Sequence, residues 1–279
     1  MANILLTGGT GKTGRRIAPR LAEAGHDVRL ASRRGADARA LRGIRFDWND
    51  PSTFDAALAN REAVYLVAPT DAPESLRAMQ PFLDRALAIG IRRYVLLSAS
   101  SLPKRGPMMG AVHAYLEEHA PEWAVLRPTW FMQNFSEQQH LPTIRDERAI
   151  FSATGEGRVP FIDVEDIAAV AVEALTRDVS FNRDLVLTGP RALSYGDVAE
   201  IVGAAIGAGV RHVNLSEGAL VERFGAAGMH PDYAAILAGM DIWIASGAED
   251  RLSPDVEAVT GRPPNDFVAY AGRVRDAWL

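Results

Sequence analysis

Cysteine is absent from this 279-residue sequence, which excludes disulfides, thiolate metal sites and a cysteine nucleophile. Charge of one sign is not concentrated either, because 30 basic and 35 acidic residues give a formal net charge of −5 and the basic residues are spread along the chain. Nucleic acids bind to clustered basic surfaces, so we expect no such partner.

Long apolar runs are also missing, and the chain does not open on a signal-peptide pattern. We therefore expect a cytoplasmic protein with no membrane partner, either a monomer or a homodimer. The six histidines have no HExxH spacing, and no GxSxG motif occurs. Metal hydrolysis and serine-hydrolase chemistry consequently have no support, and we expect no metal.

The first half of the chain alternates short apolar runs with helical patterns, which is typical of stacked βαβ units on a parallel sheet. Six strands are predicted there: Asn3–Thr7, Asp27–Ser32, Ile44–Trp48, Ala63–Pro69, Arg93–Ala99 and Trp123–Pro128. This number suits a doubly wound, Rossmann-type α/β sheet.

From about Ala149 the pattern changes to a helix at Asp163–Thr176, a strand at Asp184–Thr188, a helix at Ser194–Ile206 and then mostly helical sequence. Asp163 and Asp166 fit the start of the first of these helices better than a catalytic pair. We expect a Rossmann domain over residues 1–150 and a smaller, mainly helical lobe over residues 151–279, with a soft boundary and interleaved segments.

Three glycines, Gly8, Gly11 and Gly14, follow the first predicted strand and open the first helix. In this context glycines allow a positive-φ turn and bring backbone N–H groups close to a pyrophosphate at the helix N-terminus. A P-loop needs a glycine where Leu6 stands, so a nucleoside triphosphatase is excluded. The GxxGxxG spacing favours a dinucleotide site of the short-chain dehydrogenase/reductase type over a turn without a ligand.

The second predicted strand ends at Ser32, Arg33 and Arg34, where a site for NAD would carry an acidic residue. Guanidinium groups match a 2′-phosphate, so NADPH/NADP+ is the expected cofactor. The alternative is that both arginines only solvate a turn. Lys12 adds a cation near the phosphates.

Other cofactor contacts are expected where parallel strands end, because the dinucleotide lies across their carboxyl ends. Asp47 is either near the adenine or a turn-forming residue. The remaining candidates in the loop and at these ends are Thr10, Thr13, Trp48, Val67, Ala68, Pro69, Ser98 and Ala99.

Three segments together resemble the NmrA-like, atypical short-chain dehydrogenase/reductases: residues 7–14 (TGGTGKTG), 126–135 (LRPTWFMQNF) and 260–264 (TGRPP). Within that family, the TWFMxNF segment is most similar to the festuclavine dehydrogenase branch known from ergot alkaloid biosynthesis and its bacterial relatives. The resemblance implies NADPH binding at the first loop and a substrate pocket between the segment after the sixth strand and the C-terminal lobe. It also implies an alternative, since some NmrA-like proteins bind the dinucleotide as redox sensors without catalysis.

The Tyr-x-x-x-Lys motif that protonates a carbonyl oxygen in typical short-chain dehydrogenases is missing. Tyr115 is a candidate acid, but it lies too near the sixth strand, so we favour a packing role. His113 is a candidate for orienting cofactor or substrate, and its alternative is an ordinary surface histidine whose pKa Glu117 raises from one helical turn away.

Without a general acid, hydride transfer to an iminium is favoured, because the product is a neutral amine. Conjugated C=C bonds and quinones follow, and simple ketones come last. We expect a bulky, apolar small-molecule substrate in a pocket built by large apolar residues. These are Met108, Trp130, Phe131, Phe135 and Trp243.

The sequence therefore predicts an NADPH-dependent reductase of an electrophilic organic compound in secondary metabolism. The alternative is a non-catalytic NADP(H)-binding sensor.

Overall fold

The computed structural model describes residues 1–35, 37, 41–69 and 74–279. The chain forms two compact units, each assembled from three separate segments. Unit 1 comprises Met1–Pro128, Val164–Leu187 and Asp255–Arg262, and unit 2 comprises Thr129–Asp163, Thr188–Pro254 and Pro263–Leu279.

Unit 1 contains a seven-stranded sheet of order β3-β2-β1-β4-β5-β6-β9, in which every neighbouring pair is parallel. The strands are β1 (Asn3–Thr7), β2 (Asp27–Ser32), β3 (Arg42–Arg45), β4 (Ala63–Val67), β5 (Arg93–Leu97), β6 (Glu122–Pro128) and β9 (Arg183–Leu187). The predicted Rossmann-type fold is confirmed.

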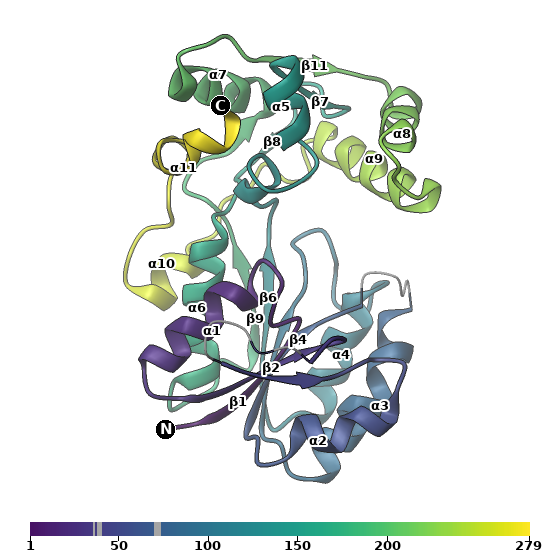
Figure 1. The fold of residues 1–279 in the computed structure, drawn as a ribbon, viewed down its shortest axis with the longest axis vertical. Helices are drawn as coiled ribbons and strands as arrows, with labels where there is room; N and C mark the ends of the chain where they lie inside the picture. The colour runs from purple at the N-terminus through teal and green to yellow at the C-terminus, as the bar shows by residue number, and fades with distance from the viewer. Residues whose placement is uncertain (36, 38–40, 70–73) are drawn as a thin grey trace. The chain divides into compact units, whose positions relative to one another are not determined.

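Helices cover both faces of this sheet, as its doubly wound topology requires (Figure 1). One layer contains α1 (Gly14–Glu23), α6 (Val164–Thr176) and α10 (Asp255–Thr260). The other contains α2 (Phe54–Leu58), α3 (Ser75–Ala88) and α4 (Met109–His119), which bury their apolar faces with the sheet in one core. Both faces of the central strands are therefore dry, and binding chemistry is left to the strand ends.

Strands β4 and β5 end two residues before their predicted ends and β6 begins one residue early, whereas two other strands depart further from the prediction. The third strand spans Arg42–Arg45 instead of Ile44–Trp48. Beyond Arg45 the Phe46 amide still donates to the Ser32 carbonyl at 2.9 Å, and the Phe46 and Trp48 rings pack against Phe82 of α3, 5.1 and 5.2 Å between centroids. The strand predicted near Asp184 belongs to this sheet as β9, paired with β6. Periodicity predicts a strand but not the sheet that the strand joins.

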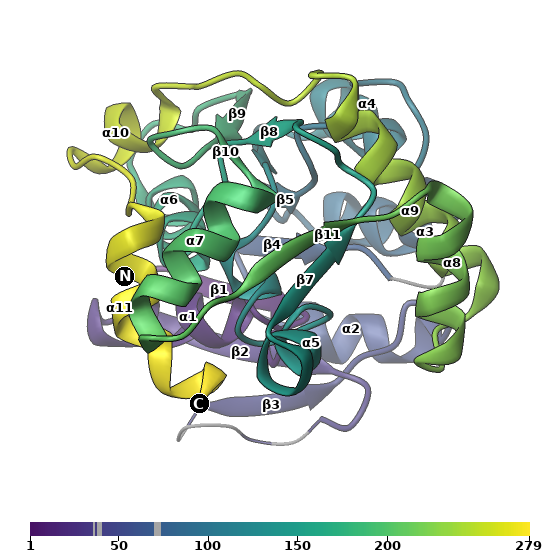
Figure 2. The same ribbon diagram turned by 90° about the horizontal axis from the view of Figure 1, so that it is seen from above.

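Unit 2 is mainly helical around two short two-stranded sheets, β7 (Ala149–Ser152) with β11 (Arg211–Asn214) and β8 (Arg158–Val159) with β10 (Leu193–Ser194). Figure 2 shows β7 and β11 side by side. Its helices are α5 (Leu141–Glu147), α7 (Tyr195–Ile206), α8 (Glu217–Ala226), α9 (Pro231–Ala245) and α11 (Phe267–Val274).

The predicted start of α7 is confirmed by a capping box. The Ser194 side chain accepts a hydrogen bond from the Asp197 amide at 3.0 Å, and the Asp197 carboxylate accepts one from the Ser194 amide at 2.9 Å. The boundary expected at residue 150 does not coincide with a passage between the units, since the chain enters unit 2 at Thr129 and returns at Val164. In the described part of the chain, no helix combines the length and hydropathy needed to cross a bilayer.

A buried carboxylate holds α9 to the rest of unit 2, and it predicts a pH-dependent stability. Asp241 is 9 % exposed, and its Oδ2 accepts a hydrogen bond from the Ala153 amide at 2.9 Å. Burial raises the pKa of Asp241 to about 6, whereas that hydrogen bond opposes the increase. Because the folded pKa lies above the unfolded one, this group's contribution is complete below about pH 4 and is lost as the pH rises through about 6.

The variant Asp241→Asn keeps an acceptor for Ala153 and cannot ionise. We expect its free energy of unfolding to exceed that of the wild type by up to about 3 kcal/mol at pH 7.5 and to match it near pH 4. Urea unfolding at both pH values measures this difference, with Asp241→Ala as the control that also loses the hydrogen bond. A difference that is the same at both pH values would contradict the prediction.

Candidate cofactor site and active site

The strand order of unit 1 reverses between β1 and β4, the position where open parallel sheets bind ligands at their carboxyl ends. Thr7, the last residue of β1, joins the two strands there. Its buried hydroxyl donates to the Tyr65 carbonyl at 3.0 Å and accepts from the Val67 amide at 2.8 Å. The switch point is therefore held rigidly directly before the glycine loop.

The glycine loop after Thr7 needs glycine at two positions for steric reasons. Gly8 has a φ of +63°, and a Cβ there would lie 3.1 Å from the Val67 Cβ. A Cβ on Gly14 would lie 2.5 Å from the Gly8 carbonyl oxygen and 2.7 Å from the Gly9 Cα. The turn is closed by the Gly11 amide, which donates to the Gly8 carbonyl at 2.8 Å. These contacts show that any side chain at Gly14 would open the loop.

Helix α1 begins directly after this loop, so the positive end of its dipole lies at the loop. Thr13 is the N-cap residue, and among the described residues its side chain contributes no capping hydrogen bond. Thr10 and Gly11 are exposed, so a ligand can approach the backbone of the loop closely. Backbone N–H groups and the positive end of the helix dipole suit a pyrophosphate, so the residues present fit a dinucleotide.

We expect Gly14→Ala to weaken NADPH binding. The new Cβ meets backbone atoms that cannot rotate away, so the loop has to move, at a cost of about 2 kcal/mol or about 30-fold in Kd. Titration of NADPH fluorescence measures the effect. Gly239→Ala is the matched control, because a Cβ at that helical glycine of α9 has nothing within 4 Å. An unchanged Kd for Gly14→Ala would show that the loop does not hold the cofactor.

The residues predicted to select the 2′-phosphate lie in the turn after β2. Arg33 and Arg34 are both exposed, and Ser32 Oγ accepts a hydrogen bond from the Gly35 amide at 3.2 Å. The turn therefore presents two guanidinium groups at the end of β2, the strand that pairs with β1. This geometry is compatible with both the phosphate-binding and the turn-solvating interpretation.

Asp47 and Trp48 follow β3, and each has a structural role. The Asp47 carboxylate accepts a hydrogen bond from the Asn49 amide at 3.0 Å, which is a turn-forming contact. The half-buried Trp48 ring packs against Phe46 at 4.8 Å between centroids. Val67, Ala68 and Pro69 are half-buried at the end of β4, and Val67 lies directly beside Gly8.

Ser98 and Ala99 follow β5, and residues of β6 hydrogen-bond to this strand end. The Ser98 amide donates to the Leu126 carbonyl at 2.8 Å, whereas its hydroxyl is buried and has no partner in the described part of the chain. Arg127 donates to the Ser100 carbonyl at 2.9 Å and pairs with Asp184 at 2.7 Å. A buried hydroxyl without a partner is costly, so Ser98 is the strand-end residue best suited to a polar ligand atom.

His113 is not a surface histidine, and its pKa is not raised. It is 2 % exposed, and its ring lies 5.6 Å from the Trp123 ring. Burial lowers the pKa of His113, because desolvation outweighs the attraction of Asp184 and Glu117. Glu117 instead forms an ion pair with Lys104 at 2.9 Å. His113 is thus a neutral, buried imidazole whose Nδ1 has no partner among the described residues.

Tyr115 faces α3, where its hydroxyl donates to the Asp84 carboxylate. Burial, and then the Asp84 carboxylate, raise the pKa of Tyr115 above its ordinary value. A phenol with a raised pKa that already donates to a carboxylate is a poor general acid. This contact supports the packing role.

The predicted substrate residues fall in both units. Met108 lies in unit 1 before α4, with a φ of +54° that a methionine rarely adopts. In unit 2, Trp130 and Phe131 are half-buried, and the segment is held by the Ile162 amide, which donates to the Trp130 carbonyl at 2.9 Å. Trp243 is 49 % exposed on α9. Phe135 is 1 % exposed inside the core, stacked on His140.

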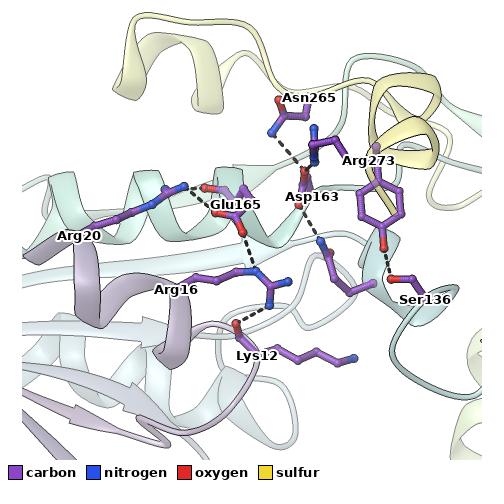
Figure 3. Close-up of polar contacts among 10 residues, drawn as sticks. Lys12, Arg16, Arg20, Ser136, Asp163, Glu165, Asn265 and Arg273 are labelled. Carbon is purple, nitrogen blue, oxygen red and sulfur yellow. Dashed lines mark hydrogen bonds and ion pairs between the residues drawn. The ribbon is translucent and has the colours of Figure 1, made fainter. Parts of the chain in front are cut away.

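Two carboxylates, Asp163 and Asp166, were expected only to start a helix, but both have further contacts, of which Figure 3 shows those of Asp163. Asp163, fully buried, accepts from Gln133 Nε2 at 2.7 Å and Asn265 Nδ2 at 3.2 Å and pairs with Arg273, all within unit 2. Asp166, also fully buried, pairs with Arg262 in unit 1 at 2.8 Å. The sequence carries no signal for these contacts, because their partners lie far away along the chain.

The parallel sheet, its switch point and the glycine cradle define a dinucleotide-binding Rossmann protein. A family model described as NAD(P)H-binding matches residues 8–178. The chain belongs to this NAD(P)H-binding family.

Three relatives align over nearly the whole chain. The uncharacterized oxidoreductase YesF of Bacillus subtilis is 43% identical over 275 residues, covering 99% of this chain and 96% of YesF. The agroclavine dehydrogenase of Claviceps fusiformis is 41% identical, covering 99% and 98% of the two chains. The festuclavine dehydrogenase easG of Aspergillus fumigatus is 37% identical, covering 99% of each. The predicted similarity to the festuclavine dehydrogenases is thereby confirmed, and the chain is an NAD(P)H-dependent oxidoreductase.

Solved structures share the fold at lower identity. The NADPH-dependent quinone oxidoreductase QOR2 of Escherichia coli, complexed with NADPH, has a TM-score of 0.84 at 20% identity and covers 97% of this chain and 99% of its own. NmrA, a negative transcriptional regulator in complex with NAD, has a TM-score of 0.78 at 13% identity, covering 99% of this chain and 95% of its own.

Proposed function

We propose that this protein is an NADPH-dependent reductase of bulky, electrophilic organic compounds, with C=N bonds preferred over conjugated C=C bonds and quinones, and simple ketones last. The observation that carries the proposal is the state of α4. Tyr115 donates to Asp84, and His113 is buried with a lowered pKa. The reaction that suits this helix is one that needs no proton from it.

Different residues are proposed to bind different parts of the dinucleotide. The glycine loop and the α1 N-terminus hold the pyrophosphate, and Arg33 and Arg34 hold the 2′-phosphate. Val67 to Pro69, Ser98 and Ala99 line the remaining strand ends. Bound NADPH supplies hydride.

The chemistry of the acceptor then decides the rate. An iminium that accepts hydride becomes a neutral amine, whereas a ketone becomes an alkoxide that needs a proton. An enone or quinone is intermediate, because the oxygen has to be stabilised until solvent protonates the product. The relatives named as agroclavine and festuclavine dehydrogenases support the C=N preference, since resemblance to that branch implies alkaloid substrates.

The substrate surface is proposed to be apolar and partly aromatic. Trp130 and Phe131 follow β6 and are half-buried, and Trp243 exposes half of its surface on α9. Phe135 is packed in the core, so we assign it to the support of this segment. Large apolar side chains of this kind bind flat, bulky molecules without demanding a precise polar pattern.

A stopped-flow screen of NADPH oxidation against iminium, enone, quinone and ketone compounds tests the proposal. We expect iminium compounds to react fastest, and the rates to survive Tyr115→Phe. Fast ketone reduction that is lost in His113→Ala or Tyr115→Phe would overturn the preference. Tight binding of NADPH that differs from NADP+ binding, with no turnover of any class, would favour a redox sensor instead.

A further inference from the structure

Arg16, in the first turn of α1, links the glycine loop to α6 (Figure 3). Its Nη1 donates to the Lys12 carbonyl at 3.0 Å, and its Nε donates to Glu165 Oε1 at 2.7 Å. The other oxygen of Glu165 accepts from Arg20 Nη2 at 2.6 Å. Both arginines therefore share one carboxylate, but it is Arg16 that also contacts the loop.

The Lys12 carbonyl lies in the middle of the segment that has to present N–H groups to a phosphate. Peptide N–H and C=O groups point in opposite directions, so a donor that holds this carbonyl also orients the neighbouring amides. Arg16 is a strong donor for this purpose, because its hydrogen bond is charge-assisted and its side chain is only 17% exposed.

Glu165 is needed to keep Arg16 in this position. The first turn of α1 contains Arg15 and Arg16 and no acidic residue, so it places positive charge at the positive end of the helix dipole. Glu165 offsets that repulsion and occupies the Nε side of the guanidinium. Without it, Arg16 would be free to turn toward solvent or toward a bound phosphate.

We infer that Arg16 and Glu165 are positioning residues for NADPH: together they set the conformation of the glycine loop and thereby the affinity for the cofactor. This rests on the assignment of the glycine loop as the pyrophosphate site, which the variant Gly14→Ala tests separately.

The test compares the dissociation constant of NADPH, measured by fluorescence titration, in Arg16→Gln, Glu165→Gln and Arg20→Gln. We expect Kd to rise about tenfold in Arg16→Gln, since one charge-assisted hydrogen bond to the loop is lost. Glu165→Gln should show a smaller increase and Arg16→Lys a partial recovery. At saturating NADPH, kcat should stay within about twofold while KM for NADPH rises.

Arg20→Gln is the matched control, because it removes an ion pair to the same carboxylate without touching Lys12. Its Kd should stay within about twofold of the wild type, although thermal unfolding shows a comparable loss of stability in both arginine variants. Equal weakening in Arg16→Gln and Arg20→Gln, or none in either, would overturn the inference. So would tighter NADPH binding in Glu165→Gln, which would mean that a released Arg16 contacts the phosphates directly.

Discussion

Replacing Arg33 and Arg34 together with alanine is expected to raise the KM for NADPH by about 100-fold and to leave the KM for NADH within about twofold. Both side chains are exposed in the turn after β2, where they can approach the 2′-phosphate that only NADPH carries. Charge-assisted hydrogen bonds to a phosphate are worth about 1.5–3 kcal/mol, so losing both arginines removes about 3 kcal/mol of binding. Steady-state kinetics with each cofactor measures the change.

Arg42→Ala is the control for a general loss of positive charge at this sheet edge. Arg42 is also exposed, but it begins β3 and pairs in register with Arg29 rather than with the end of β2. Its effect on both KM values should be small. If the double variant changes NADPH and NADH equally, the arginines do not recognise the 2′-phosphate and only solvate their turn.

Replacing Asp163 with alanine is expected to lower the free energy of unfolding by about 3–5 kcal/mol. Asp163 is fully buried, and its carboxylate binds three side chains of unit 2, those of Gln133, Asn265 and Arg273. The substitution leaves the Gln133 amide, only 2 % exposed, without this acceptor. Urea unfolding followed by tryptophan fluorescence measures the loss.

Two further variants define the cause. Asp163→Asn keeps an oxygen acceptor and should lose less stability than Asp163→Ala. Asp276→Ala removes another aspartate paired with an arginine, Arg275, but its side chain is 88% exposed, so we expect a change within about 0.5 kcal/mol. If Asp163→Ala has the same midpoint urea concentration as the wild type, the hydrogen bonds and ion pair of this carboxylate do not stabilise the fold.

Local patterns predicted much of unit 1. The bounds of β1 and β2 agree with the expected strands, and α6 begins directly after Asp163 as predicted. The glycine spacing was sufficient to predict a dinucleotide loop, because its reason lies in backbone geometry within seven residues. The actual contacts, a Cβ at Gly14 against the Gly8 carbonyl, are equally local.

Features that join distant segments were beyond prediction. The partners Arg16 and Glu165 are separated by 149 positions, and Arg273 and Asp163 by 110. His113 shows the same limit, because its spacing to Glu117 predicted a raised pKa whereas burial against the sheet lowers it. Desolvation depends on everything that surrounds a group, and neighbours in sequence supply only part of that environment.

The glycine loop therefore illustrates both sources of information. Its sequence by itself determined the cofactor class, since turn sterics and helix-terminus electrostatics act within one βα unit. Only the tertiary structure decided that β9 and α6 return to complete unit 1, that Asp163 is buried in unit 2, and that Glu165 holds Arg16 against the loop. Those outcomes follow from packing and desolvation between segments that the chain brings together only when it folds.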